Sequence, residues 1–409
     1  MGNVIGIVAE YNPFHNGHAR LIEQTRARLG ADCPVVCVMS GDFVQRGSPA
    51  VYAKFARAEA AARCGADLVL ELPLPWALSS AEGFARGAVG LLGSLGVVTH
   101  LSFGSECGEL EPLQRVAEAL LDPLLGEDLR AELQAGIPFA AARQQAVARR
   151  VGALAELLQA PNNILAVEYL KAIFDQRLDL HPLTILRTGA QHDRPAEGNV
   201  RSASELRTRI GAGENVSAFL PRAAAEISAR EKKLGRGPVL PEALESAILS
   251  RLRMLPQTVY NALPGASEGL GNGLYRAAHE EPTLDGVLAA AKSKRYALSR
   301  IRRMTMCAAL GVTAGMDAGV CACAGHRRAG QGAAARDRRA HGGAGHHEAG
   351  RRTEPAGRSR RNICPDGGCA RSLCAWLPRQ RGATLRRRLA REPVCAVTGR
   401  VRKVFEILI

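Results

Sequence analysis

Two histidines and a glycine stand in the short segment "EYNPFHNGHARL" (residues 10–21), directly after the apolar run "VIGIVA". In a helix that starts here, His15 and His18 are three residues apart and lie on one face, roughly 5–6 Å apart at Cβ. The start of such a helix offers free backbone N–H groups and a positive dipole end, which suit a phosphate. The pattern therefore predicts chemistry at phosphorus.

The residues around this pair fit the same chemistry. Gly17 lets a ligand approach the backbone, and Asn12 with Pro13 fixes the turn before the helix. Histidines held in this way can donate hydrogen bonds to phosphoryl oxygens as charge builds in a displacement. The alternative is a plain solvated turn, because "NP" and "NG" are common turn dipeptides.

A second loop, "GDFVQRG", follows the apolar run "CPVVCVMS" and supplies Asp42 and Arg46. Asp42 can orient a substrate or a Mg²⁺ ion, which keeps several waters and needs few protein ligands. The alternative for Asp42 and Arg46 is a salt bridge within the loop. Both loops must lie at one edge of a sheet if they are to act together.

Alternating strand and helix signals in the first 106 residues supply such a sheet. The expected strands are the apolar runs 4–9, 33–40, 67–73 and 97–106, and the expected helices span about 18–29, 54–64 and 79–95. Strands that are apolar throughout and joined by helices indicate a parallel sheet covered on both faces. We expect an α/β fold, a Rossmann-like doubly wound parallel sheet that binds ligands outside the carboxyl ends of its strands.

The rest of the chain is mainly helical, apart from one strand, "LHPLTIL", and a new helix that begins at "SASELRTRI". We expect three parts: a catalytic domain over 1–200, a mainly helical domain over 201–315, and a tail over 316–409. His100, His181 and His192 stand alone in the sequence and are interpreted as structural. The cysteines before the tail show no metal-ligand spacing and fit a reduced, cytoplasmic protein.

The tail carries most of the charge. Residues 316–409 hold 20 lysines and arginines against 7 acidic residues, whereas residues 1–315 hold 34 against 32. Three interpretations fit: a disordered Arg-rich RNA-binding arm, a metal site from Cys364, Cys369 and Cys374, or a shifted reading frame in a GC-rich gene. We favour the shifted frame, and we expect these residues to be disordered. No run of about 18 apolar residues and no signal-peptide pattern is present, so we expect a cytoplasmic protein without a membrane segment.

Several blocks together resemble the bacterial tRNA(Met) cytidine acetate ligases, which have the H-x-G-H nucleotidyltransferase signature. These blocks are "GIVAEYNPFHNGH", "SGDFVQRGSPAVYAKFARAEAAARCGADLVLELP", "LSFGSE", "PNNILAVEYLKA", "SASELR" and "RYALSRIRRM". The resemblance extends from residue 1 to about 313 and stops where the tail begins. It implies a ligase that activates acetate with ATP to acetyl-adenylate and acetylates N4 of the wobble cytidine of elongator tRNA(Met).

The resemblance also implies roles for individual residues. His15, His18 and Asp42 are the expected catalytic residues, and Mg²⁺ is expected to accompany ATP. The expected ATP-binding residues are Ile7, Val8, Ala9, Glu10, Tyr11, Asn12, Pro13, Phe14, His15, Asn16, Gly17, His18, Ala19, Arg20, Gly104, Asn162, Arg187 and Ser204. Asn162 can also serve only as a helix N-cap, and Ser204, one turn before Arg207, as a cap or a phosphate donor. Glu205 departs from the small or hydroxyl residue expected at its position.

The basic stretch "KSKRYALSRIRR" is the expected tRNA contact, through phosphates and without base reading. Its cations are Lys292, Lys294, Arg295, Arg300, Arg302 and Arg303. The alternative is a solvated helix face. Two rival functions remain: a small-molecule adenylyl- or cytidylyltransferase, a class whose domains are only about 160 residues long, and a non-catalytic RNA-binding protein. The choice of carboxylic acid and the oligomeric state do not follow from the sequence.

Overall fold

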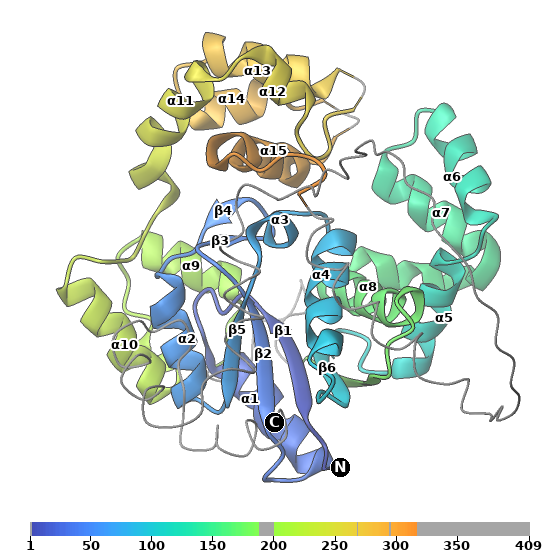
Figure 1. The fold of residues 1–409 in the computed structure, drawn as a ribbon, viewed down its shortest axis with the longest axis vertical. Helices are drawn as coiled ribbons and strands as arrows, with labels where there is room; N and C mark the ends of the chain where they lie inside the picture. Colours follow the sequence, from blue (N-terminus) through green and yellow to red (C-terminus); the bar gives the residue numbers. More distant parts are fainter. Residues whose placement is uncertain (1, 188–199, 268, 294–295, 317–409) are drawn as a thin grey trace, which may run out of the picture. The chain divides into compact units, whose positions relative to one another are not determined.

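A five-stranded parallel sheet forms the centre of the structure, a computed structural model that describes residues 2–187, 200–267, 269–293 and 296–316 (Figure 1). The strand order is β5-β2-β1-β6-β7. The strands are β1 (Ile5–Ala9), β2 (Val35–Ser40), β5 (Leu68–Leu72), β6 (His100–Ser105) and β7 (His181–Leu186). A separate antiparallel pair, β3 (Phe43–Val44) and β4 (Ser48–Pro49), follows β2. The predicted doubly wound parallel sheet is confirmed.

Fifteen α-helices occur among the described residues. Those up to the last strand are α1 (Asn16–Leu29), α2 (Lys54–Arg63), α3 (Leu74–Ala77), α4 (Ala81–Ser94), α5 (Leu110–Leu120), α6 (Leu125–Gln134), α7 (Phe139–Val151) and α8 (Pro161–Asp175). After β7 come α9 (Ala203–Gly211), α10 (Arg222–Lys233), α11 (Glu245–Met254), α12 (Gln257–Asn261), α13 (Leu270–Glu280), α14 (Leu284–Ala290) and α15 (Leu298–Leu310). No helix in these ranges is both long and apolar enough to cross a membrane.

Both faces of the sheet are buried, and side chains of one strand alternate between two cores. In β2, Val36 and Val38 pack into one core, while Val35, Cys37 and Met39 pack into the other. Successive side chains of a strand point to opposite faces, so a strand covered on both sides must be apolar throughout. This is why the central strands read as continuous apolar runs.

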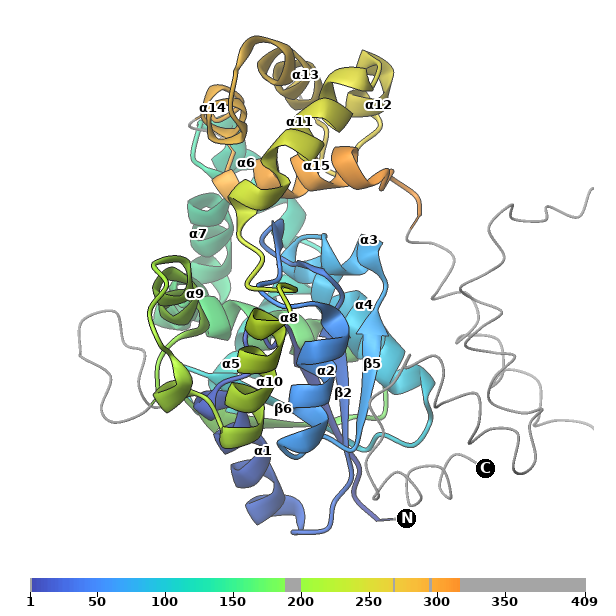
Figure 2. The same ribbon diagram turned by 90° about the vertical axis from the view of Figure 1, so that its left-hand side faces the viewer.

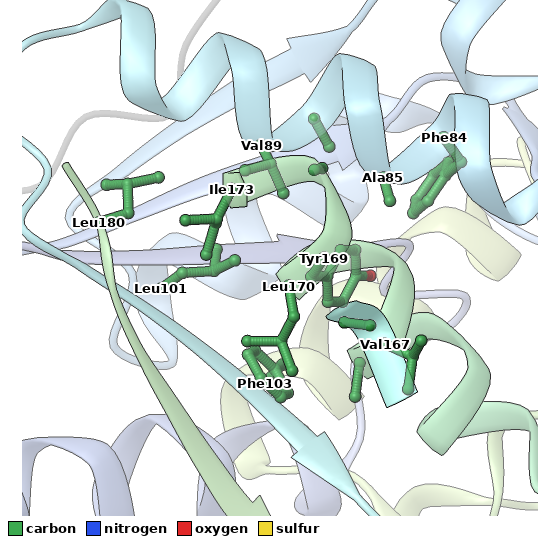
Figure 3. Close-up of a cluster of buried hydrophobic side chains, with 14 of the residues drawn as sticks. Phe84, Ala85, Val89, Leu101, Phe103, Val167, Tyr169, Leu170, Ile173 and Leu180 are labelled. Carbon is green, nitrogen blue, oxygen red and sulfur yellow. The ribbon is translucent and has the colours of Figure 1, made fainter. Parts of the chain in front are cut away.

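One core lies between the sheet and the helices α4, α5 and α8. Figure 3 shows Leu101 and Phe103 of β6 beside Leu170 and Ile173 of α8, with Val89 of α4 next to them. The opposite core joins the sheet to α1, α2, α9 and α10. Figure 2 shows α2, α9 and α10 on this second side.

The strand order reverses at β1, and this reversal predicts where a ligand binds. β1 pairs with β2 on one side and with β6 on the other, all in parallel register. In an open sheet of this type, the crevice outside the carboxyl ends of the strands at the switch point is the usual ligand site. The turn after β1 and the end of β6 therefore flank the expected site.

The last helices build a third core from residues 248–312, which also includes Leu78 and Phe43. The helices α9 and α10 are not part of it, because Leu206, Ile210 and Ile227 pack with the sheet instead. The expected boundary between domains at residue 200 stays a prediction. From the division of the cores, we propose that the boundary lies nearer to residue 240.

Two details of the sequence prediction change. The first helix begins at Asn16 and not at His18, with His15 as its N-cap. His100 and His181 are not isolated, because they are direct neighbours in the β6–β7 register, with ring centroids 5.3 Å apart. Sequence separation hid this pairing, which only the sheet creates. His192 and the whole tail from residue 317, including its three candidate cysteine ligands, lie outside the described residues.

Candidate active site

The two histidines after β1 form a reciprocal cap at the start of α1. The Nδ1 atom of His15 accepts a hydrogen bond from the backbone N–H of Gly17 at 3.0 Å. The Nδ1 atom of His18 accepts from the backbone N–H of His15 at 3.2 Å. The two rings lie close, with centroids 3.8 Å apart. The spacing of three residues is therefore used for mutual positioning as well as for placement on one helix face.

This capping decides which nitrogen of each ring carries the proton. A neutral imidazole has one N–H donor and one acceptor, and in both rings Nδ1 is the acceptor. The proton of each neutral ring is therefore on Nε2, which takes no part in the helix start. His15 and His18 thus each offer one Nε2–H donor, and the backbone around them holds the rings in place.

Burial keeps both rings neutral. The pKa of His15 is lowered to about 3, mainly because the ring is buried and secondly because of the positive charges of Arg187 and Arg207. The pKa of His18 is also lowered well below its usual value, first by burial and then by His15 and Arg187. At neutral pH the pair therefore donates hydrogen bonds without carrying charge before a ligand binds.

The lowered pKa of His15 predicts that the protein loses stability in acid. Between pH 6.5 and about 3 the unfolded chain binds a proton at this position that the folded chain does not, so the free energy of unfolding falls with falling pH. The slope from this residue is about 1.4 kcal/mol per pH unit. Urea unfolding of wild type and His15→Asn at pH 4, 5 and 7 measures it. We expect a smaller pH dependence in the variant, and equal slopes would contradict the prediction.

Aromatic rings and a glycine support the histidine pair. The ring centroid of His18 lies 4.9 Å from that of Tyr11 and 5.5 Å from that of Phe14. A Cβ atom at Gly17 would stand 2.9 Å from Cε1 of His15, which is too close. Gly17 is therefore required by the His15 ring itself, in addition to the ligand approach expected from the sequence.

Asn12 joins the turn to the neighbouring loop. Its Oδ1 accepts from the backbone N–H of Val51 at 2.8 Å, and its carbonyl accepts from Nη1 of Arg207 at 2.9 Å. The side chain is 1% exposed, and its Nδ2 group is buried without a hydrogen-bond partner. Because buried polar groups are nearly always paired, the unpaired amide of Asn12 is an unusual feature of this turn, and its role in ATP binding stays a prediction.

Arginines from two later segments reach the same turn. Arg207 of α9 holds the Asn12 carbonyl and also donates to Oγ of Ser204 at 2.9 Å. Arg187, directly after β7, is close enough to both histidines to affect their pKa values. The positive charges of Arg46 and Arg207 likewise act on each other. The carboxyl edge of the sheet thus gathers cations suited to a polyphosphate.

The helix α9 is capped by Ser202, whose Oγ accepts from the backbone N–H of Glu205 at 3.1 Å. The alternative of Ser204 as the cap of this helix is therefore wrong, because the helix begins at Ala203, two residues earlier than a cap at Ser204 would place it. Ser204 is exposed, and its hydroxyl is in contact with Arg207. The role of Ser204 as a hydrogen-bond donor to a phosphate stays a prediction.

Gly104 of β6 makes room for Arg187. A Cβ atom at Gly104 would stand 2.9 Å from Cγ of Arg187 and 3.2 Å from its Cδ. The glycine therefore lets the stem of this arginine cross the end of β6. This gives Gly104 a definite role at the site, since it determines where the guanidinium of Arg187 can lie.

Asn162 lies in the first turn of α8, beside a carboxylate that the sequence analysis did not select. Oε1 of Glu106 accepts from the backbone N–H of Asn162 at 3.1 Å and from its Nδ2 at 2.6 Å, while Oε2 accepts from the backbone N–H of Asn163 at 2.7 Å. The N-cap is Ala160, so the alternative of Asn162 as an N-cap is wrong. Glu106 instead neutralises this helix start and orients the Asn162 amide.

The loop after β2 is fixed to the start of α2 and to the turn after β1. Oδ1 of Asp42 accepts from the backbone N–H of Lys54, at the start of α2, at 2.7 Å. Oε1 of Glu10 accepts from the backbone N–H of Gln45 at 2.9 Å. Neither Asp42 nor Arg46 forms an ion pair with another described residue, so the predicted alternative of a salt bridge within the loop is wrong. Asp42 is exposed and can meet a ligand.

Comparison with known proteins identifies the family. Residues 2–318 match the family HIGH Nucleotidyl Transferase. The tRNA(Met) cytidine acetate ligase of Syntrophomonas wolfei is 42% identical over 309 residues, covering 73% of this chain and 74% of the relative. The enzyme of the same name from Acetivibrio thermocellus is 37% identical over 323 residues, covering 76% and 77%. This chain belongs to the tRNA(Met) cytidine acetate ligase family.

Solved structures agree with this assignment. The structure of Thermotoga maritima TmcAL bound with alpha-thio ATP is 38% identical, has a TM-score of 0.70, and covers 76% of this chain and 75% of that one. The apo form of the same protein gives a TM-score of 0.71. The resemblance seen in the ordered sequence motifs is therefore confirmed, and so is the fold.

Most of the other expected ATP-binding residues of this family member lie in or directly after β1. Ile7, Val8 and Ala9 are within the strand, and Ile7 is fully buried in the core, so it can reach a ligand only through its backbone. Pro13 is joined to Asn12 by a cis peptide bond. Asn16, Ala19 and Arg20 line an open hollow on α1 of about 460 Å³. Their role in ATP binding stays a prediction.

The cations expected to contact tRNA differ in how exposed they are and in whether other groups of the protein already bind them. Arg300 is engaged by the carbonyl of Gly265, at 2.7 Å from Nη2, and its guanidinium lies over the ring of Tyr296. Arg302 and Lys292 are exposed, and Arg303 is partly buried. Lys294 and Arg295 lie outside the described residues. Arg302 and Lys292 are thus the described members of this set best placed to meet a phosphate.

Two residues of the site were missed in the sequence, Glu106 and Arg57. Glu106 is the last residue of the predicted strand 97–106, at the carboxyl end where polar side chains often meet a ligand. Arg57 stands among the alanines on the buried face of α2, and a cation on an apolar helix face is itself a signal. Neither has a spacing motif that marks it out.

Proposed function

We propose that this protein is an ATP-dependent ligase that converts acetate and ATP to acetyl-adenylate and pyrophosphate, then transfers the acetyl group to N4 of the wobble cytidine of elongator tRNA(Met). The observation that carries the proposal is the reciprocal cap of His15 and His18, which fixes two Nε2–H donors at a helix start in a member of this family. A reaction on tRNA also places the protein in the cytoplasm.

In the first step, a carboxylate oxygen of acetate attacks the α-phosphorus of ATP. A new P–O bond forms, the bond between the α-phosphorus and the bridging oxygen breaks, and pyrophosphate leaves. Negative charge moves onto oxygens that face the helix start, where His15 and His18 donate hydrogen bonds and Arg187 and Arg207 supply positive charge. Donors that are fixed before the reaction stabilise the transition state at little reorganisation cost.

In the second step, the N4 amine of cytidine attacks the acetyl carbon of the adenylate. The bond between that carbon and the phosphate oxygen breaks, AMP leaves, and the amine loses one proton. The cations that held pyrophosphate in the first step remain to hold the AMP phosphate. One phosphate-binding edge therefore serves both steps.

Magnesium fits this site as a companion of ATP. Among the described residues no group of three metal-ligating side chains is present, so the chain offers no all-protein cage. Mg²⁺ is commonly bound through substrate phosphates, waters and one or two carboxylates. Asp42, exposed and with one oxygen engaged by α2, is the carboxylate that would hold it, and the ion would supply charge neutralisation for the leaving pyrophosphate.

Acetate-dependent exchange of labelled pyrophosphate into ATP tests the first step, and incorporation of labelled acetate into elongator tRNA(Met) tests the second. We expect both with the full chain and Mg²⁺. Exchange that depends on a different small substrate would favour a small-molecule nucleotidyltransferase. Binding of tRNA with no exchange under any acid would favour a non-catalytic RNA-binding protein.

Exposed cations near α15 are expected to bind tRNA through its phosphates. Each lost phosphate contact should flatten the slope of log affinity against log salt concentration by about 0.7 to 1. We therefore expect Arg302→Ala to weaken tRNA binding and to reduce this slope. Filter binding at salt concentrations from about 50 to 200 mM measures both. Lys232→Ala, at an exposed lysine of α10, is the matched control. An unchanged slope in Arg302→Ala would contradict the assignment.

A further inference from the structure

Arg57 of α2 is an arginine almost completely enclosed by protein, with 2% of its surface exposed. Its Nε donates to the carbonyl of Tyr52 at 2.9 Å. Nη1 donates to the carbonyls of Glu10 at 2.5 Å and Ser40 at 3.2 Å, and Nη2 donates to the carbonyl of Gly41. Four backbone oxygens thus surround one guanidinium.

Arg57 forms no ion pair with a carboxylate of any described residue. Burial lowers its pKa to about 10, so the group still carries its charge at neutral pH. The negative charges of Asp42, Glu10 and Glu71 act against this shift, but none of the three pairs directly with Arg57, and hydrogen bonds to carbonyls offset only part of the cost of burying the charge. The positive charge of Arg57 and the arrangement of its N–H donors therefore need an explanation other than packing of the core.

The four acceptors belong to the segments that carry the site. Glu10 begins the turn that leads to His15, Ser40 and Gly41 end β2 directly before Asp42, and Tyr52 leads into α2. Three other side-chain hydrogen bonds between described residues join these segments: Asn12 to Val51, Glu10 to Gln45 and Asp42 to Lys54. A planar guanidinium with five fixed donors can bind several carbonyls at once, whereas a lysine ammonium cannot reproduce this arrangement.

We propose that Arg57 is a positioning residue that fixes the turn after β1 and the loop after β2 in one geometry, and that its charge makes the carboxyl edge of the sheet more attractive to the phosphates of ATP. It touches no reacting atom and acts through the backbone of Glu10 and Gly41. The inference deepens the proposed function and rests on ATP as the ligand of this edge. A misplacement of about 1 Å at a site can cost a hundredfold in rate.

The chain offers a matched control at the opposite edge of the sheet. Arg26 of α1 is also largely buried and binds Oδ2 of Asp67 at 2.7 Å and the carbonyl of Cys33 at 3.2 Å. Asp67 in turn accepts from the backbone N–H of Val35, at the amino end of β2. Removing Arg26 should therefore weaken the fold as Arg57 removal does, but away from the site.

The test compares full-length wild type, Arg57→Lys, Arg57→Met and Arg26→Met. Thermal unfolding by circular dichroism sets a temperature at which each is folded. ATP affinity is then measured by calorimetry without acetate, and KM for ATP and kcat by pyrophosphate exchange. We expect Arg57→Met to weaken ATP binding at least about tenfold and to lower kcat/KM by about a hundredfold. Both values for Arg57→Lys should lie between those of wild type and Arg57→Met. Both values for Arg26→Met should stay within about twofold of wild type.

The outcomes separate this inference from the proposed function. If wild type binds ATP but shows no exchange with acetate, the proposed function fails and the ATP affinities still test Arg57. Should Arg57→Met fail to fold, Arg57→Lys decides, because wild-type ATP affinity with lysine would overturn the role of the guanidinium geometry. If Arg57→Met and Arg26→Met lose ATP affinity and kcat/KM equally, in proportion to their loss of thermal stability, then Arg57 has only a structural role and the inference is wrong.

Discussion

Replacing His18 with asparagine should lower acetate-dependent pyrophosphate exchange by about a hundredfold, or roughly 2.7 kcal/mol of transition-state stabilisation, with little change in thermal stability. The Oδ1 atom of asparagine can take the place of Nδ1 and accept from the backbone N–H of His15, so the helix start is kept. The Nε2–H donor is lost. This variant therefore separates the chemical role of His18 from its role in capping α1.

His18→Ala and the melting temperature are the controls for this experiment. Alanine removes both the cap and the donor, so its exchange rate should match that of His18→Asn while its melting temperature falls further. A cap contributes about 1 kcal/mol to stability. If His18→Asn keeps its activity and only His18→Ala loses it, then the pair serves the turn alone and the phosphate role is wrong.

Replacing Gly47 with alanine should cost at least about 3 kcal/mol of stability, because two penalties act together. Gly47 has a φ of +75°, a conformation that disfavours any side chain. A Cβ atom there would also stand 2.6 Å from the backbone nitrogen of Arg303 and 2.7 Å from the carbonyl carbon of Arg302. Backbone atoms of α15 cannot move away as a flexible side chain could.

Gly96→Ala is the matched control for Gly47→Ala. Gly96 has a φ of +71°, but no atom lies within 4 Å of the Cβ position. Its substitution should cost only the backbone penalty of about 1–2 kcal/mol. Urea unfolding of both variants gives the difference, which measures the close approach of α15 to the loop after β2. Equal losses would mean that α15 does not rest on Gly47 in solution.

This approach matters because it joins segments with different expected tasks. The loop of residues 41–49 carries Asp42 and Arg46, and α15 carries the exposed Arg302. Phe43, at the start of the β3–β4 hairpin, packs with the core of the last helices. A change at Gly47 should therefore weaken tRNA binding as well as stability, because it shifts Arg302 away from the active-site loop.

The sequence by itself determined the sheet and the phosphate-binding turn. Strands buried on both faces must be apolar throughout, so β1 and β2 were visible as continuous apolar runs. The His15–His18 spacing was visible because one helical turn relates the two residues and no distant part of the chain is needed. Family motifs in a fixed order added the reaction, which no local pattern of charge or hydropathy contains.

Only the tertiary structure decided what depends on residues distant in sequence. Glu106 reaches Asn162 across 56 positions, Arg57 binds the carbonyl of Glu10 across 47, and α15 meets Gly47 from the far end of the described chain. His100 and His181 became neighbours through strand register. Local propensity acts over a few residues, whereas a half-buried carboxylate, a buried cation or a glycine packed against a helix is explained only by the atoms that folding brings against it.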